Sequence, residues 1–141
     1  MRQSEQERSI TLKVLVIGGV ACGPKTAARR KRLCPDAYIT MIEKGSIVSY
    51  GACGLPYYVE GLFPDIEELV NTPAGVPRDA VFFDKVKGFK VLIKTEALSI
   101  DRKNKTVRVR YSESGKEENL AYDKLVLATG GYAFRPPIPG I

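Results

Sequence analysis

The chain has 141 residues, of which 44% are hydrophobic and 27% are charged, and its formal net charge is +6. This length predicts one domain with its own core, and no apolar run approaches the ~20 residues of a membrane-spanning helix. Three cysteines and no histidine argue against a disulfide framework, exclude a Cys/His catalytic pair and leave too few ligands for a zinc site. We therefore expect a soluble, cytoplasmic protein without a metal.

The chain opens with a polar segment followed by an apolar one. Residues 1–10 contain no apolar stretch of the kind found in signal peptides, and we expect them to form a disordered tail. Residues 11–17 read TLKVLVI, a mostly apolar and β-branched run that stops at Gly18 and Gly19. Such a run predicts a buried strand of a parallel sheet.

A helix and a second strand are expected next. Pro24 suits the first turn of a helix, and no helix-breaking residue follows before Pro35, so the helix should end near Cys34. Residues 38–42, YITMI, then predict a second strand. Together these elements form a βαβ unit.

Three residues of this unit have the spacing of a dinucleotide site. Gly18 allows a tight turn after the strand, Gly23 allows the helix to pack closely, and the helix amides would face a pyrophosphate. Glu43 follows the last glycine by about 20 residues, where a carboxylate can bind an adenosine ribose. Val20 stands where the usual pattern has its middle glycine. The alternative is an ordinary glycine-rich loop.

Four basic residues occur together at positions 29–32. Neighbouring positions of a helix point in different directions, so a solvated helix flank is the first interpretation. A phosphate contact by one or two of these residues is the second. We expect no nucleic acid partner, because no aromatic or glycine-rich RNA motif accompanies the run.

The remaining elements are shorter. Asp65 is expected to cap a helical turn at 66–70, and a second short helix is expected at 78–86. The expected strands are a third parallel strand at 89–93, an antiparallel meander at 97–101, 106–111 and 119–122, and a buried strand at 125–131. The proline-rich residues 136–141 predict the start of a linker.

Cys53 stands between glycines and before a stretch, residues 54–60, that is compatible with a helix. Because the thiolate is the nucleophile, a reactive cysteine needs positive potential, which the amino end of a helix supplies without a histidine. We predict that Cys53 is a redox thiol. We expect Cys22 and Cys34 to be small buried apolar residues.

No second cysteine lies five positions from Cys53, where Val48 and Tyr58 stand. An internal CxxxxC disulfide is therefore excluded, and the thiol must react through a mixed disulfide, a persulfide or a sulfenic acid. Ser49 is either a hydrogen-bond donor to the reacting sulfur or a loop hydroxyl.

Four segments resemble the single-cysteine flavoprotein pyridine nucleotide-disulfide oxidoreductases. These are VIGGVACG at 16–23, IEKG at 42–45, SYGACGLPYYVEG at 49–61 and YDKLVLATGGYAFRPPIPG at 122–140. That class includes coenzyme A disulfide reductase, persulfide reductase and NADH oxidase or peroxidase. The resemblance implies a Rossmann-like FAD-binding βαβ sheet with an antiparallel meander, truncated in this chain.

The resemblance also implies roles for individual residues. Cys53 would be the redox centre beside the flavin, with Ser49 near it. The implied FAD contacts are Gly18, Val20, Gly23, Glu43, Lys44, Ala97, Ala128, Thr129 and Gly130. The implied coenzyme A contacts are Lys25, Arg29, Arg32 and Ser49. Ala52 and Gly131 replace the asparagine and serine that such enzymes usually carry.

On this interpretation residues 11–135 form a partial FAD-binding domain that precedes a missing NAD(P)H domain. The parent protein would be a homodimer that uses FAD and NAD(P)H to reduce a small disulfide, persulfide or polysulfide, coenzyme A-linked ones included, and the chain alone would be inactive. One alternative is an NADH oxidase or peroxidase that uses a Cys53 sulfenate. The other is a bare nucleotide-binding module.

Overall fold

The computed structural model describes residues 11–131 and 133–140. Its elements in chain order are β1 (Lys13–Ile17), α1 (Cys22–Leu33), β2 (Tyr38–Ile42), the 3₁₀ turn η1 (Ala52–Gly54), α2 (Leu55–Glu60), the 3₁₀ turn η2 (Ile66–Leu69), α3 (Ala80–Lys87), β3 (Lys90–Leu92), β4 (Thr95–Asp101), β5 (Thr106–Tyr111), β6 (Glu117–Ala121) and β7 (Lys124–Leu127). The tail expected at residues 1–10 lies outside the described residues.

The strands form two sheets. A parallel sheet has the order β3-β2-β1-β7, and an antiparallel sheet has the order β4-β5-β6. Strand β1 pairs in parallel with both β2 and β7, although β7 follows it by more than 100 residues of sequence. The predicted α/β class, with a βαβ unit and a three-stranded meander, is confirmed.

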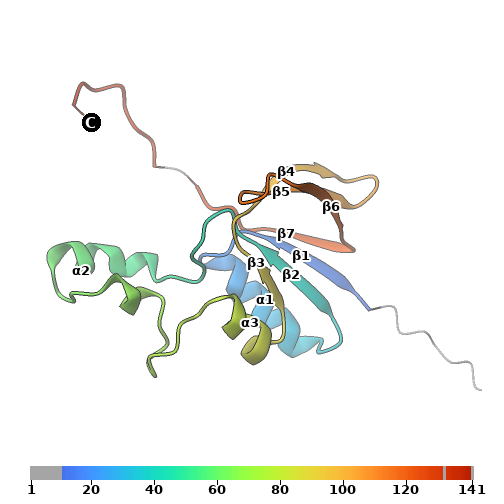
Figure 1. Ribbon diagram of the computed structural model, residues 1–141, viewed down its shortest axis with the longest axis horizontal. Helices are drawn as coiled ribbons and strands as arrows, with labels where there is room; N and C mark the ends of the chain where they lie inside the picture. The colour runs from blue at the N-terminus through green and yellow to red at the C-terminus, as the bar shows by residue number, and fades with distance from the viewer. Residues whose placement is uncertain (1–10, 132, 141) are drawn as a thin grey trace, which may run out of the picture.

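Both faces of the parallel sheet are covered (Figure 1). Helices α1 and α3 lie on one face and the meander lies on the other. Val16 of β1 packs in a cluster with Phe83 of α3, whereas its neighbour Leu15 packs with Val107 and Val109 of β5. Because successive strand residues point to opposite faces, burial of both faces requires the continuous apolar run of β1.

The predicted boundaries of the βαβ unit hold with small shifts. Strand β2 matches its prediction, and β3 lies inside the predicted 89–93. Strand β7 ends at Leu127 and not at 131. The Ala128 N–H donates to the Ile17 carbonyl at 2.8 Å, and Gly130 then adopts a left-handed φ of 69°. This conformation turns the chain away from the sheet.

The meander has one buried and one solvated face, as predicted. Val107 and Val109 are fully buried, and Arg108 and Arg110 between them are exposed. Its last strand is Glu117–Ala121 and not the expected 119–122. Tyr122 leaves the ladder because its N–H donates to the Lys105 carbonyl at 2.9 Å.

Aspartate side chains cap the first turns of η2 and α3, which lie between α2 and β3 in the sequence. The Asp65 carboxylate accepts from the Glu67 N–H at the start of η2, at 2.8 Å. The Asp79 carboxylate accepts from the Phe82 N–H at 2.8 Å, so α3 begins at Ala80 and not at the predicted 78. In both cases the side chain satisfies an amide that the first turn leaves unpaired.

We predict that Gly23→Ala destabilises the fold by about 2–3 kcal/mol, because overpacking next to rigid backbone costs that much. A Cβ at Gly23 would lie 1.8 Å from the Gly18 carbonyl oxygen. The measurement is urea denaturation followed by circular dichroism. Gly131→Ala is the control, because a Cβ there would meet nothing within 4 Å. Equal stability of the two variants would contradict the prediction.

A second prediction concerns Tyr111, whose hydroxyl donates to the Glu118 carboxylate. Burial, together with that hydrogen bond and the negative charge of Glu118, raises the pKa of Tyr111 to about 12. A raised folded pKa stabilises the folded state below the unfolded pKa of 10, and this stabilisation is lost as the pH rises through about 12. Tyr111→Phe removes the hydrogen bond to Glu118 and should for that reason lower the free energy of unfolding at neutral pH.

The test is denaturation of both proteins across the alkaline range. Between pH 10 and 12 the wild type should lose stability faster than the Tyr111→Phe variant. Parallel curves would show that Tyr111 titrates alike in the folded and unfolded states.

Candidate functional site

The turn after β1 brings three backbone segments into contact. Gly18 has a left-handed φ of 108°, and its N–H donates to the Ile42 carbonyl at 2.9 Å. A Cβ on Gly18 would lie 2.1 Å from the Ala128 carbonyl oxygen, at the end of β7. A Cβ on Gly23 of α1 would lie 1.8 Å from the Gly18 carbonyl oxygen. Only glycine fits at both positions.

Helix α1 begins at this turn with its first amides uncapped. Ala21, which precedes the helix, makes no side-chain capping hydrogen bond, and the first turn contains no acidic residue. The last turn carries Arg30, Lys31 and Arg32. Unpaired amides at the amino end of a helix of this length form a favourable environment for an anion such as a pyrophosphate.

Glu43, at the end of β2, is held by backbone amides. Its Oε2 accepts from the Gly19 N–H at 2.7 Å, and its Oε1 accepts from the Gly45 N–H at 2.9 Å. Its own carbonyl accepts from the Thr95 N–H at 2.9 Å. Each carboxylate oxygen keeps a second lone pair, so the fixed carboxylate can still accept hydrogen bonds from ribose hydroxyls.

A cavity of about 250 Å³ opens beside Glu43. Its walls are formed by Ile17, Gly18, Ile42, Glu43, Lys44, Thr95, Glu96, Ala97, Thr129 and Gly130. These residues lie at or just beyond the carboxyl ends of β1, β2 and β7 and at the start of β4. In open α/β sheets ligands bind at the carboxyl ends of the strands.

The cavity unites most of the residues that the resemblance assigns to the cofactor. The assigned residues on its wall are Gly18, Glu43, Lys44, Ala97, Thr129 and Gly130. The wall does not include Val20, Gly23 or Ala128, of which the last two act through the close backbone contacts at Gly18.

Ile17, Ile42, Thr95 and Glu96 also line the cavity, and the sequence reasoning missed them. Ile17 and Ile42 are the last residues of β1 and β2, so their position at strand ends could have identified them from the sequence. Thr95 and Glu96 could be identified only once the start of β4 was known.

A larger cavity, about 450 Å³, lies at the opposite edge of the sheet. Lys31, Tyr38, Asp84 and Lys90 contribute to its wall, and it adjoins the amino ends of β2 and β3. No residue implicated by the sequence in cofactor binding or redox chemistry lines it. The smaller cavity beside Glu43 is therefore the better candidate site.

Cys53 is exposed and lies in η1, directly before α2. The predicted helix at 54–60 is confirmed from Leu55 onward, with the cysteine and Gly54 in the preceding 3₁₀ turn. Gly54 packs against Leu69, where a Cβ would lie 2.5 Å from the leucine Cδ2. Cys53 does not line the cavity.

Two backbone hydrogen bonds attach the cysteine segment, residues 49–54, to the rest of the fold. The Ser49 N–H donates to the Gly19 carbonyl at 2.7 Å, and the Gly51 N–H donates to the Leu69 carbonyl at 2.7 Å. Ser49 has a left-handed φ of 55°. The segment that carries Cys53 is thus anchored to the glycine turn through Ser49.

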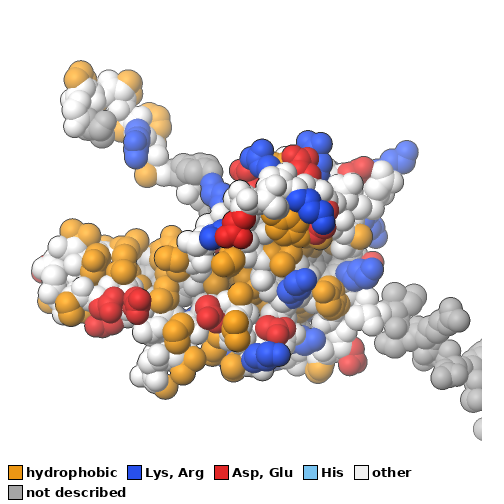
Figure 2. Space-filling model, viewed as in Figure 1, with side chains coloured by type: hydrophobic (Ala, Val, Ile, Leu, Met, Phe, Trp, Pro, Cys, Tyr) orange, Lys and Arg blue, Asp and Glu red, His pale blue; other side chains and the backbone are white. Residues whose placement is uncertain are grey.

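Beyond this anchor the chain projects from the body of the molecule. Figure 1 shows α2 extending away from the sheet, and Figure 2 shows apolar side chains gathered on this projection. Its large exposed apolar residues are Leu55, Tyr57, Val59 and Leu62. Helix α2 buries none of its residues.

The expectation that Cys22 and Cys34 are buried is wrong for Cys22 and holds only in part for Cys34. Cys22 is exposed at the start of α1, with its Sγ 3.8 Å from the Thr26 Oγ1. The close contact at Gly23 turns that neighbour toward the sheet and leaves Cys22 on the solvent side. Cys34 is half-buried against the helix-facing core cluster.

The basic residues of α1 divide into two groups. Lys25, Arg29 and Arg32 are exposed, and their spacing of four and three residues places them on one face of the helix. Arg30 is half-buried, and the Lys31 Nζ donates to the Ala37 carbonyl at 2.9 Å. Only the first group is arranged as an exposed cationic surface.

No helix among residues 11–131 and 133–140 combines the length and the apolar character needed to cross a membrane.

The sequence of the chain also matches known proteins. The sequence profile of the pyridine nucleotide-disulphide oxidoreductase family matches residues 12–141.

A NAD-dependent persulfide reductase from A. fulgidus has a similar structure, with 47% identity and a TM-score of 0.87, over 90% of this chain and 23% of that chain. The NAD(P)H coenzyme A polysulfide/persulfide reductase of Pyrococcus horikoshii is 37% identical over 130 residues, 92% of this chain and 26% of the relative. An NADH oxidase of Methanocaldococcus jannaschii is 30% identical over 130 residues, again 92% of this chain and 27% of the relative.

The chain thus spans about a quarter of the length of the curated relatives that it matches. The profile covers nearly all of the described residues, including the glycine turn, Glu43 and the cysteine segment. The resemblance inferred from the four sequence segments is therefore confirmed, and the chain belongs to the pyridine nucleotide-disulphide oxidoreductase family.

Proposed function

We propose that this chain is the FAD-binding portion of an NAD(P)H-dependent oxidoreductase that reduces a disulfide, persulfide or polysulfide through Cys53. The observation that carries the proposal is the cavity at the carboxyl ends of the parallel strands, where Glu43, Ala97 and Thr129 meet the glycine turn. The similarity to persulfide and polysulfide reductases supports this class of substrate. The parent protein would be a homodimer.

The residues around the cavity suit a flavin dinucleotide. Gly18 and Gly23 carry no side chains, so a pyrophosphate could approach the amides at the start of α1, beside Val20. Glu43 would bind the ribose, and Lys44 and Ala97 would line the adenosine pocket. The contacts at the flavin end would come from Ala128, Thr129 and Gly130. Bound FAD would supply two-electron transfer between NAD(P)H and a sulfur group.

Cys53 would carry the reaction with the substrate. Its thiolate attacks one sulfur of the substrate disulfide, a new S–S bond forms to Cys53, and the other half leaves as a thiolate. No cysteine stands at Val48 or Tyr58 to form an internal disulfide, so the mixed disulfide or persulfide must itself be reduced. Ser49, which precedes Cys53 by four residues, would donate a hydrogen bond to the leaving sulfur.

The exposed basic face of α1 favours coenzyme A as the group to which the substrate sulfur is attached. Lys25, Arg29 and Arg32 would bind its phosphates, with Ser49 nearer the reacting sulfur. The similarity to an NAD(P)H coenzyme A polysulfide/persulfide reductase supports this assignment. We expect this chain to be inactive alone, because it spans only about a quarter of the length of its reductase and oxidase relatives.

A second candidate function is an NADH oxidase or peroxidase that forms a Cys53 sulfenate. The similarity to an NADH oxidase favours it. The two candidates share the FAD site and differ in the acceptor that reaches Cys53. They are separated by comparing NAD(P)H consumption with a disulfide or polysulfide against consumption with oxygen or peroxide.

We predict that Cys53→Ser in the full-length protein abolishes disulfide and polysulfide reduction while FAD remains bound. A serine hydroxyl cannot form the S–S bond that the reaction needs. The measurements are NAD(P)H consumption and the flavin absorption spectrum. Cys22→Ser is the control, because Cys22 is also exposed but has no assigned role. Retained reduction in Cys53→Ser would overturn the assignment of the cysteine.

We predict that Glu43→Gln weakens FAD binding by roughly ten- to a hundredfold, the value of one or two hydrogen bonds to a charged group. The amide replaces one of the two carboxylate oxygens that now accept from Gly19 and Gly45. Fluorescence titration of the flavin-free protein measures the change. Glu60→Gln on the exposed α2 is the matched control. Unchanged affinity in Glu43→Gln would move the ribose contact to another residue.

A further inference from the structure

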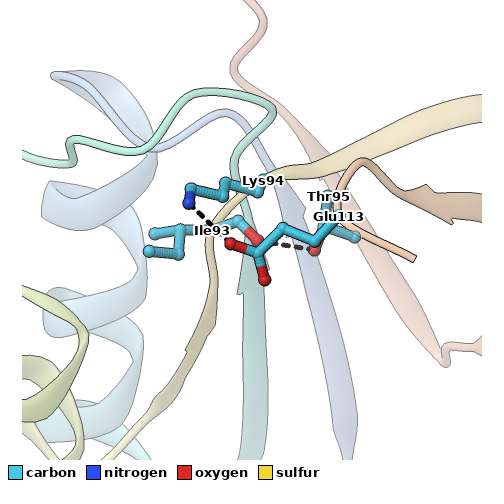
Figure 3. A network of polar contacts seen from close by, with 4 residues as sticks. All are labelled: Ile93, Lys94, Thr95 and Glu113. Atoms are coloured by element: carbon cyan, nitrogen blue, oxygen red, sulfur yellow. Dashed lines mark hydrogen bonds and ion pairs between the residues drawn. The ribbon is translucent and has the colours of Figure 1, made fainter. Parts of the chain in front are cut away.

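The two sheets are joined by a two-residue junction, shown in Figure 3. Strand β3 ends at Leu92 and β4 begins at Thr95, so only Ile93 and Lys94 separate them. Lys94 has a left-handed φ of 50°, which is uncommon for a residue other than glycine, asparagine or aspartate. The surrounding structure must therefore hold this residue in place.

Backbone hydrogen bonds attach the junction to the Glu43 turn. The Lys94 N–H donates to the Gly45 carbonyl at 2.9 Å, and the Thr95 N–H donates to the Glu43 carbonyl at 2.9 Å. The Thr95 hydroxyl donates to the Ile93 carbonyl at 2.9 Å, within the junction. These hydrogen bonds fix the start of β4 relative to Glu43, whose carboxylate lines the cavity.

The junction is also attached to the turn between β5 and β6. The Ser112 N–H donates to the Lys94 carbonyl at 2.8 Å. The Lys94 Nζ forms an ion pair with the Glu113 Oε1 at 2.6 Å (Figure 3). The hydrogen bond and the positive charge of Lys94 lower the pKa of Glu113, so this carboxylate remains ionised at neutral pH.

This ion pair is too exposed to contribute much to global stability. The side chains of Lys94 and Glu113 are 44% and 72% exposed, and exposed pairs contribute little. Its position is more informative than its strength. It links the junction to the β5–β6 turn, which lies beside the start of β4 because Thr95 pairs with Tyr111. Strand β4 supplies Thr95, Glu96 and Ala97 to the cavity wall.

We propose that Lys94 and Glu113 are positioning residues of the nucleotide site. Their ion pair holds the β5–β6 turn against the junction and thereby fixes the wall formed by residues 95–97 relative to Glu43. The adenosine half of a bound dinucleotide would lie between these two walls. This inference rests on the proposed function, because it assumes that the cavity binds FAD.

The test uses the full-length protein stripped of its flavin and titrated with FAD and, separately, with ADP. ADP reports on the adenosine half alone. Glu113→Gln should weaken both ligands about three- to fivefold, as expected for loss of one exposed ion pair. The matched control is Glu117→Gln, which removes the same charge and an ion pair to Arg108 but does not reach the junction.

Lys94→Gly separates positioning from stability. Glycine adopts a left-handed φ readily, so the thermal midpoint of this variant should fall no further than that of Glu117→Gln. Affinity for ADP and FAD should nevertheless drop as in Glu113→Gln. The charge-reversed pair, Lys94→Glu with Glu113→Lys, should restore affinity to within about twofold, since it re-forms the ion pair.

Salt provides an independent readout. At an ionic strength of about 1 M the exposed pair is screened, so the affinity ratio between wild type and Glu113→Gln should approach one. A purely structural role would lower midpoint and affinity together at every salt concentration.

The outcomes are distinguishable. If the wild type binds neither ADP nor FAD, the proposed nucleotide site itself is overturned. If the wild type binds both, and Glu113→Gln and Lys94→Gly bind as tightly as Glu117→Gln, only the positioning role is overturned.

Discussion

The approach of Gly23 to the carbonyl of Gly18 determines how the rest of the site is built. At this contact the end of β1 meets the start of α1, and the end of β7 reaches the same turn through Ala128. Side chains at either glycine would push these backbones apart. Because the three backbone segments stay in contact, the uncapped amides of α1 lie at the carboxyl edge of the sheet, near the cavity.

Glu43 connects this turn to the other wall of the cavity. Its carboxylate bonds to Gly19 and Gly45, and its carbonyl bonds to Thr95 at the start of the meander. The same residue therefore holds the glycine turn, keeps free acceptor lone pairs beside the cavity and locates β4. A substitution at Glu43 acts on all three, which is why its effect on cofactor affinity is expected to exceed that of a single lost contact.

The cysteine segment has a different physical character. It is fastened to the core at Ser49 and Gly51, and beyond these points it exposes Cys53 and the apolar side chains of α2. A reactive thiol has to be accessible. Cys53 is exposed, and the hydrogen bond from Ser49 to Gly19 keeps its segment attached to the glycine turn.

The sequence by itself determined the βαβ unit and the family, because these depend on local patterns: a buried strand is a continuous apolar run, a tight turn needs glycine, and motif spacing is readable along the chain. Only the tertiary structure decided that Thr95 and Glu96 form the facing wall and that Cys22 is exposed. These features depend on strand order and on packing between distant segments, and local periodicity carries no information about either.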